Sequence, residues 1–86
     1  MHTEVPKAVK VTEYFASIMN RPDRAGIRPE WIQRVMDYPE KEQTQADGRI
    51  RRWAAIPKAG NRYLRVVLLA DGKTVHNAFF DRSFRR

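Results

Sequence analysis

The 86-residue sequence predicts a single α+β domain in which two N-terminal helices pack on one face of an antiparallel β-sheet. Two observations carry this prediction. Apolar residues recur at helical spacing before residue 40. After it come segments in which the two faces of a strand alternate residue by residue, separated by turn signals. Hydrophobic residues make up 42% of the chain and charged residues 31%, which argues against disorder. We expect one domain over residues 1–86, with a loose arm at 1–8 and a basic tail at 82–86.

Two amphipathic stripes predict the helices. The first stripe follows the spacing i, i+3, i+4, i+7, i+8 and consists of Val11, Tyr14, Phe15, Ile18 and Met19. Thr12 is a suitable N-cap for it, Pro22 ends it, and Lys10–Thr12 can form a short strand before it. Pro29 suits the first position of the second helix. The second stripe consists of Trp31, Ile32, Val35 and Met36, and Tyr38-Pro39 closes it.

The sheet is predicted from four segments, which are Glu42–Gln45, Arg49–Ile56, Arg62–Leu69 and Thr74–Phe80. The turns between them are Asp47-Gly48, residues 57–61, and Asp71-Gly72 as a two-residue hairpin. In the third segment Leu64, Val66 and Leu68 form an apolar set that should face the helices, which leaves Tyr63 and Arg65 on the open face. We expect this set to share one core with five residues of the helical stripes, namely Phe15, Ile18, Trp31, Ile32 and Val35. The second and fourth segments have no clear inner set, because one residue of register error reverses every assignment.

Positive charge is concentrated in the C-terminal half. Residues 1–48 hold seven basic and eight acidic side chains, whereas residues 49–86 hold ten basic and two acidic ones, a net charge of +8. Most of the ten are arginines, whose planar fork matches phosphate oxygens. This asymmetry favours a surface for nucleic acid or for an acidic protein partner. The alternative is a solvated face that serves only solubility.

Several classes of function are excluded. Without cysteine the chain has no disulfide, thiolate metal site or cysteine nucleophile, which suits the cytoplasm. Lys7 and Lys10 interrupt the early apolar stretch, so we expect no signal peptide, and the longest apolar run, Val66–Ala70, is too short to span a membrane. No His, Asp or Glu pair has metal-ligand spacing, and no glycine-rich phosphate loop is present. We therefore expect no metal, no cofactor and no membrane partner.

The remaining chemistry is metal-independent RNA cleavage. RNA supplies its own 2′-hydroxyl nucleophile, so a protein needs only to orient it, move a proton and stabilise the phosphate charge. The predicted catalytic residues are Arg65, His76 and Arg52. If Asp71-Gly72 sets a two-residue register, Arg65 becomes the diagonal neighbour of His76. The predicted nucleic-acid-binding residues are Arg49, Arg51, Tyr63 and Arg82. In the alternative reading, His76, Tyr63 and Trp53 are packing residues.

Several segments of this chain resemble small bacterial proteins related to the RelE/ParE/BrnT toxin superfamily. They are Arg28-Pro29-Glu30-Trp31, Asp47-Gly48-Arg49-Ile50-Arg51-Arg52-Trp53, Tyr63-Leu64-Arg65-Val66-Val67 and the run from Asp71 to Arg82. The resemblance implies a RelE-like toxin fold, RNA cleavage without metal, and an acidic antitoxin that covers the basic surface. ParE-like members act on a topoisomerase instead, so the fold alone does not settle the target.

Our leading hypothesis is a toxin-like, metal-independent endoribonuclease of a bacterial toxin–antitoxin pair. It would act on RNA that is free or bound to the ribosome. The alternative is a non-catalytic basic binding module for nucleic acid or for an acidic protein.

Overall fold

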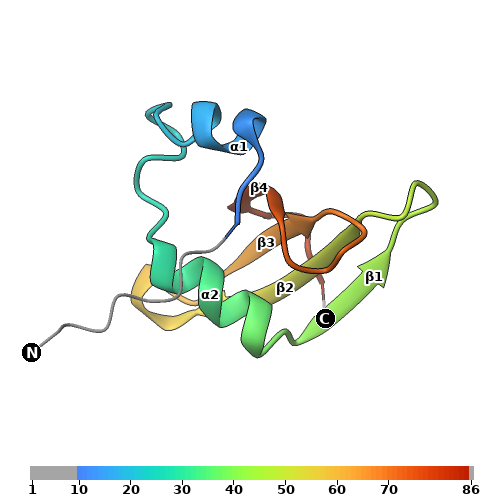
Figure 1. Cartoon of the computed structure of the whole chain (residues 1–86). Coiled ribbons are helices and arrows are strands. Elements are labelled where there is room, and N and C mark those ends of the chain that lie inside the picture. Colours follow the sequence, from blue (N-terminus) through green and yellow to red (C-terminus); the bar gives the residue numbers. More distant parts are fainter. Residues whose placement is uncertain (1–9, 86) are drawn as a thin grey trace, which may run out of the picture.

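The structure, a computed structural model, describes residues 10–85 as two helices and a four-stranded antiparallel sheet (Figure 1). In chain order the elements are α1 (Glu13–Ile18), α2 (Pro29–Asp37), β1 (Lys41–Thr44), β2 (Ile50–Ile56), a 3-10 turn (Pro57–Ala59), β3 (Arg62–Leu68) and β4 (Val75–Phe80). The strands lie side by side in sequence order. The α+β class is therefore confirmed. The arm expected at 1–8 lies outside the described residues.

Local sequence signals account for where both helices begin. The Thr12 hydroxyl oxygen accepts a hydrogen bond from the Phe15 backbone N–H at 3.0 Å, as expected of an N-cap. Pro29 opens α2, where its missing N–H costs nothing. The short strand expected at Lys10–Thr12 is reduced to one parallel bridge between Val11 and Val75.

One hydrophobic core lies between the helices and the sheet. In Figure 1, α2 lies over the sheet and α1 lies beside β4, and the contacts place α2 on β2 and β3. Seven predicted core residues are buried in a single cluster, namely Phe15, Ile18, Ile32, Val35, Leu64, Val66 and Leu68. The eighth, Trp31, is half-buried and packs against this cluster. The sheet face that carries Leu64, Val66 and Leu68 is called the helix face below, and the opposite one the outer face.

The register of β4 follows the predicted one as far as Val75 and then departs from it. A two-residue hairpin would pair Leu68 with Val75 and Val67 with His76. The first pair is present, but Val67 pairs with Asn77. His76 is thus the extra residue of a β-bulge. The bulge lets both Val75 and Ala78 enter the core, and both are fully buried. This explains why strict alternation showed no inner set in this strand.

The loop between β3 and β4 is longer than the predicted two-residue turn, and the side chain of Asp71 stabilises it. Its carboxylate accepts hydrogen bonds from the backbone N–H groups of Lys73 and Thr74 and from the Thr74 hydroxyl. Gly72 takes a positive φ of 69°, which suits glycine. The Leu69 N–H donates a hydrogen bond to the Thr74 carbonyl, with an N-to-O distance of 2.9 Å. The loop therefore closes at this pair rather than at Ala70 and Lys73.

Among the helices of residues 10–85, none has the length and apolar character that a membrane span requires.

Candidate nucleic-acid interface

The outer face of the sheet is partly covered by the chain's own C-terminal segment. The Phe84 ring stacks on Trp53 with centroids 5.1 Å apart, and it lies 4.7 Å from the Tyr63 ring. Trp53 is consequently only 4% exposed although it lies outside the main core. The segment expected to be a basic tail thus carries an aromatic side chain that packs on the sheet. The only sequence signal for this was an apolar residue inside the basic run.

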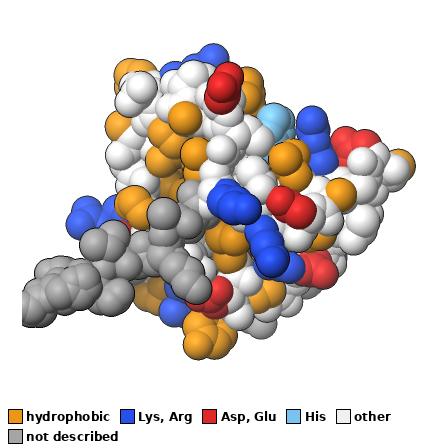
Figure 2. Space-filling model, viewed as in Figure 1, with side chains coloured by type: hydrophobic (Ala, Val, Ile, Leu, Met, Phe, Trp, Pro, Cys, Tyr) orange, Lys and Arg blue, Asp and Glu red, His pale blue; other side chains and the backbone are white. Residues whose placement is uncertain are grey.

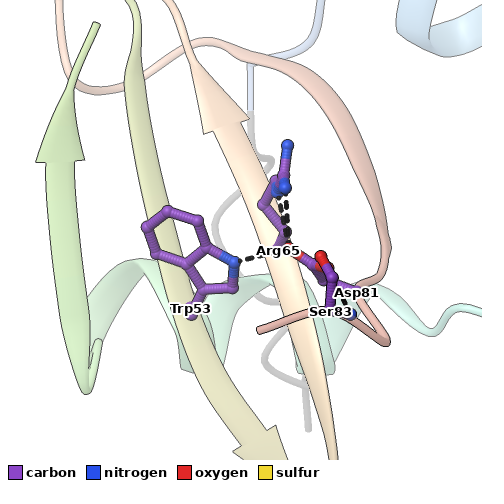
Figure 3. Close-up of polar contacts among 4 residues, drawn as sticks. All are labelled: Trp53, Arg65, Asp81 and Ser83. Atoms are coloured by element: carbon purple, nitrogen blue, oxygen red, sulfur yellow. Dashed lines mark hydrogen bonds and ion pairs between the residues drawn. The ribbon is translucent and has the colours of Figure 1, made fainter. Parts of the chain in front are cut away.

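Asp81 is the centre of a hydrogen-bond network beneath this segment (Figure 3). One carboxylate oxygen accepts from the Trp53 indole N–H at 3.0 Å and from two guanidinium nitrogens of Arg65 at 3.1 and 2.7 Å. The other oxygen accepts from the backbone N–H and the hydroxyl of Ser83. Burial tends to raise the pKa of Asp81. The hydrogen bonds from Trp53, Ser83 and Arg65 outweigh burial and hold this pKa well below its usual range.

Arg65 is therefore engaged inside the protein. Its side chain is 21% exposed, against 6% for Asp81, and its guanidinium also lies 4.8 Å from the centre of the Phe79 ring. The predicted position on the outer face is correct. A phosphate at Arg65 would compete with an ion pair that is already formed, and one that is largely desolvated.

Arg52 lies on the other side of the sheet. It is the strand partner of Val66, which belongs to the helix face. Its guanidinium contacts Glu42 at 2.6 Å and donates to the backbone carbonyl of Met36 at 3.1 Å. Arg52 therefore joins β1 to the end of α2 and does not approach Arg65.

His76 is also separate from Arg65. The bulge carries it to α1, where its Nδ1 lies 3.1 Å from the Thr12 hydroxyl oxygen and its ring stacks on Tyr14 at 5.0 Å. Arg65 pairs with Phe79 instead. The predicted arrangement, in which Arg65 is the diagonal neighbour of His76, is wrong. The register argument failed because the bulge was not visible in the sequence.

The predicted binding residues divide into two groups. Arg51 pairs with Val67 at one end of β2 and β3, and Tyr63 pairs with Ala55 at the other end. Arg49 lies in the β1–β2 turn next to Asp47, with an Nε-to-carboxylate distance of 3.8 Å. Arg51 is half-buried, and its Nε has no hydrogen-bond partner among residues 10–85. Only Tyr63 and Arg82 are brought together.

These two residues line a pocket of about 360 Å³ where β3 begins and β4 ends, called the C-terminal pocket here. Its lining combines three arginines with three aromatic rings, namely Arg62, Arg82, Arg85, Tyr63, Phe80 and Phe84. Asp81 also lines it, but its charge is balanced by Arg65. The guanidinium of Arg62 lies 4.0 Å above the Phe80 ring. Sequence reasoning missed Arg62, Phe80 and Phe84, because their proximity depends on strand pairing.

Charge on the α2 side of the molecule is mixed. Figure 2, which has the same view as Figure 1, shows basic and acidic side chains interspersed with apolar ones on this side. No group of three or more His, Cys, Asp or Glu within the described chain could hold a metal ion. No family model, curated protein or solved structure matches this chain. The chemistry of the C-terminal pocket is therefore what points to a function.

Proposed function

We propose that this chain binds RNA and that the C-terminal pocket is the binding site. The observation that carries the proposal is the gathering of Arg62, Arg82 and Arg85 around three partly exposed rings in one pocket. Guanidinium groups form charge-assisted hydrogen bonds with phosphate oxygens, and ring faces stack on unpaired bases. An acidic protein could pair with the same cations, but an unpaired strand places phosphates and base faces side by side along its whole length, as the arginines and rings of this pocket are placed. This supports the binding-module reading, with nucleic acid as the ligand.

The test is RNA affinity after removal of two of these cations. Arg62→Ala combined with Arg82→Ala should weaken binding of a labelled single-stranded RNA by about a hundredfold or more, since each charged hydrogen bond is worth about 1.5 to 3 kcal/mol. Fluorescence anisotropy at one fixed salt concentration measures it. The matched control is Arg21→Ala with Lys73→Ala, which removes the same charge from exposed positions outside the pocket. Equal affinities for the two double variants would contradict the proposal.

A metal-independent endoribonuclease of a toxin–antitoxin pair is the second candidate. The observation that favours it is a hydrogen bond of 3.3 Å from the hydroxyl of Tyr63, which lines the C-terminal pocket, to a carboxylate oxygen of Glu40. Glu40 can accept the proton of a 2′-hydroxyl as that oxygen bonds to phosphorus. Tyr63 can give its proton to the 5′-oxygen as the P–O5′ bond breaks, which yields a 2′,3′-cyclic phosphate. The resemblance to RelE-like toxins supports this candidate, and an acidic antitoxin would cover the same pocket.

Cleavage of RNA in the presence of a chelator tests this second function. Glu40→Gln and Tyr63→Phe should each lower the cleavage rate by about a hundredfold, the usual effect of losing a general acid or base. His76→Ala serves as the control and should cleave as the parent does, because His76 lies at α1. The candidate is rejected if the parent cleaves no RNA either alone or with ribosomes, or if Glu40→Gln retains full activity.

A further inference from the structure

A second basic pocket lies next to the C-terminal pocket. It has a volume of about 680 Å³ and lies between the start of α2 and the turn after β2. We call it the α2 pocket, and the lining residues that matter are Arg28, Glu30, Trp31, Arg34, Ile56 and Lys58. None of them was singled out as a binding residue from the sequence.

The described residues that line the α2 pocket carry a net positive charge, with three cations and one carboxylate. The carboxylate, Glu30, accepts a hydrogen bond of 2.9 Å from Arg28, and this bond, together with the nearby positive charge of Lys58, lowers the pKa of Glu30. Arg34 and Lys58 are exposed and make no ion pair with any residue of the described chain. The half-buried Trp31 ring lies between them and the core. The pocket thus offers positive charge beside a large ring, as the C-terminal pocket does.

The two pockets meet through direct contacts. The Trp31 ring of the α2 pocket lies edge-on to the Phe80 ring of the C-terminal pocket, with centroids 6.1 Å apart. Ile56 of the α2 pocket is the strand partner of Arg62, which stacks over the same Phe80. The contact between the Trp31 and Phe80 rings, with Arg62 over the Phe80 ring, therefore joins the two pockets.

We propose that the two pockets form one track for single-stranded nucleic acid, in which the α2 pocket binds a base on Trp31 and the adjacent phosphate on Arg34 and Lys58. This inference rests on the proposed function and specifies its substrate. A duplex hides its base faces in the stack, whereas an unpaired strand can turn successive bases onto rings that lie in hollows. An acidic peptide such as polyglutamate would gain binding affinity from the cations alone.

Oligonucleotide length provides the test. Two unstructured RNA strands are compared, one of about 4 nucleotides that can fill a single pocket and one of about 10 nucleotides that can span both. In the variant Arg34→Ala with Lys58→Ala, affinity for the longer strand should fall about a hundredfold or more, since two charged contacts are lost. Affinity for the shorter strand should change little, because the C-terminal pocket remains intact. Both side chains are exposed, so the fold should persist, as circular dichroism can verify.

Further arms of the experiment separate this inference from the proposed function. Arg62→Ala with Arg82→Ala should weaken binding of both strands, and Arg21→Ala with Lys73→Ala should weaken neither. If those results hold but the Arg34 and Lys58 variant binds the longer strand as the parent does, the track is overturned and the C-terminal site stands. If the parent binds neither strand, both proposals fail. Equal affinity for a duplex of the same length, or for a polyglutamate peptide, would also overturn the track.

Discussion

Asp81 determines whether the side chains around it are free to bind a ligand. Its carboxylate takes hydrogen bonds from Trp53, Arg65 and Ser83, and it is almost fully buried. A buried carboxylate is tolerated because these donors replace the water it has lost. Arg65, one of the three residues predicted to be catalytic, is thereby used to hold the C-terminal segment on the outer face.

At the residue scale we predict that Asp81→Asn destabilises the protein in a pH-dependent manner. At pH 7 the variant should lose about 2 to 3 kcal/mol of unfolding free energy, since a desolvated Arg65 would lose its charged partner. The folded-state pKa of Asp81 is lowered, so its stabilisation is complete above the unfolded value of about 3.9 and is lost as the pH falls through the folded value. The difference between parent and variant should therefore shrink from pH 4 downward.

Urea unfolding followed by tryptophan fluorescence measures this difference at each pH. Asp37→Asn, at an exposed position on α2, is the control and should leave the stability nearly unchanged. A difference that stays constant from pH 7 to about pH 2 would show that the ionised carboxylate of Asp81 is not the source of the stabilisation.

The bulge in β4 and the cap of α1 act together at the level of elements. The bulge places His76 against Thr12 and Tyr14, and two backbone hydrogen bonds join residues 10 and 12 to Val75. α1 has only six residues and would not be stable alone. It is held in place by the burial of Phe15 and Ile18 and by this contact with β4.

At the element scale we predict that Thr12→Ala lowers the unfolding free energy by about 1 kcal/mol, the usual cost of losing an N-cap hydroxyl. The variant loses the acceptor for the Phe15 N–H and the hydroxyl contact with His76. Thr12→Ser keeps a hydroxyl at this position and should retain most of the stability. Chemical denaturation of the three proteins gives the comparison. Equal stability of the Ala and Ser variants would show that the cap contributes nothing.

For the whole molecule, the important feature is where the excess of positive charge lies. Residues 49–86 carry a net charge of +8, yet ion pairs occupy Arg49, Arg52 and Arg65. Of the other basic residues in this half of the chain, Arg62, Arg82 and Arg85 line the C-terminal pocket and Lys58 lines the α2 pocket. Net charge predicts attraction to an anionic partner, whereas the pockets define where that partner can bind.

At this scale we predict that the salt dependence of RNA affinity reports the number of phosphate contacts. For single strands the slope of log K against log salt is about −0.7 for each neutralised phosphate. Three arginines in the C-terminal pocket give a slope of about −2 for a short strand. Adding Arg34 and Lys58 gives about −3.5 for a strand that spans both pockets. Anisotropy titrations across a salt series measure both slopes. Affinity that is indifferent to salt would exclude binding through these cations.

Local signals in the sequence determined the elements of this protein. The cap at Thr12, the proline that opens α2, the turn at Asp47-Gly48 and the alternation in β3 act between residues close in the chain, so their effects could be predicted. The confirmed burial of Leu64, Val66 and Leu68 follows from this alternation alone. Of the candidate site, the sequence indicated the basic half and the residues Tyr63 and Arg82.

The tertiary structure alone decided which side chains meet. The bulge at His76 shifted the register of β4 beyond Val75 and moved His76 away from Arg65. Arg52 faces the helices and Arg65 is bound by Asp81, because strand pairing fixes the face of each residue and the C-terminal segment folds back on the sheet. In a sheet the side chains alternate with period two, so a shift of one residue reverses every neighbour. No local pattern carries that information, and it is this register that brings the arginines and rings of the C-terminal pocket together.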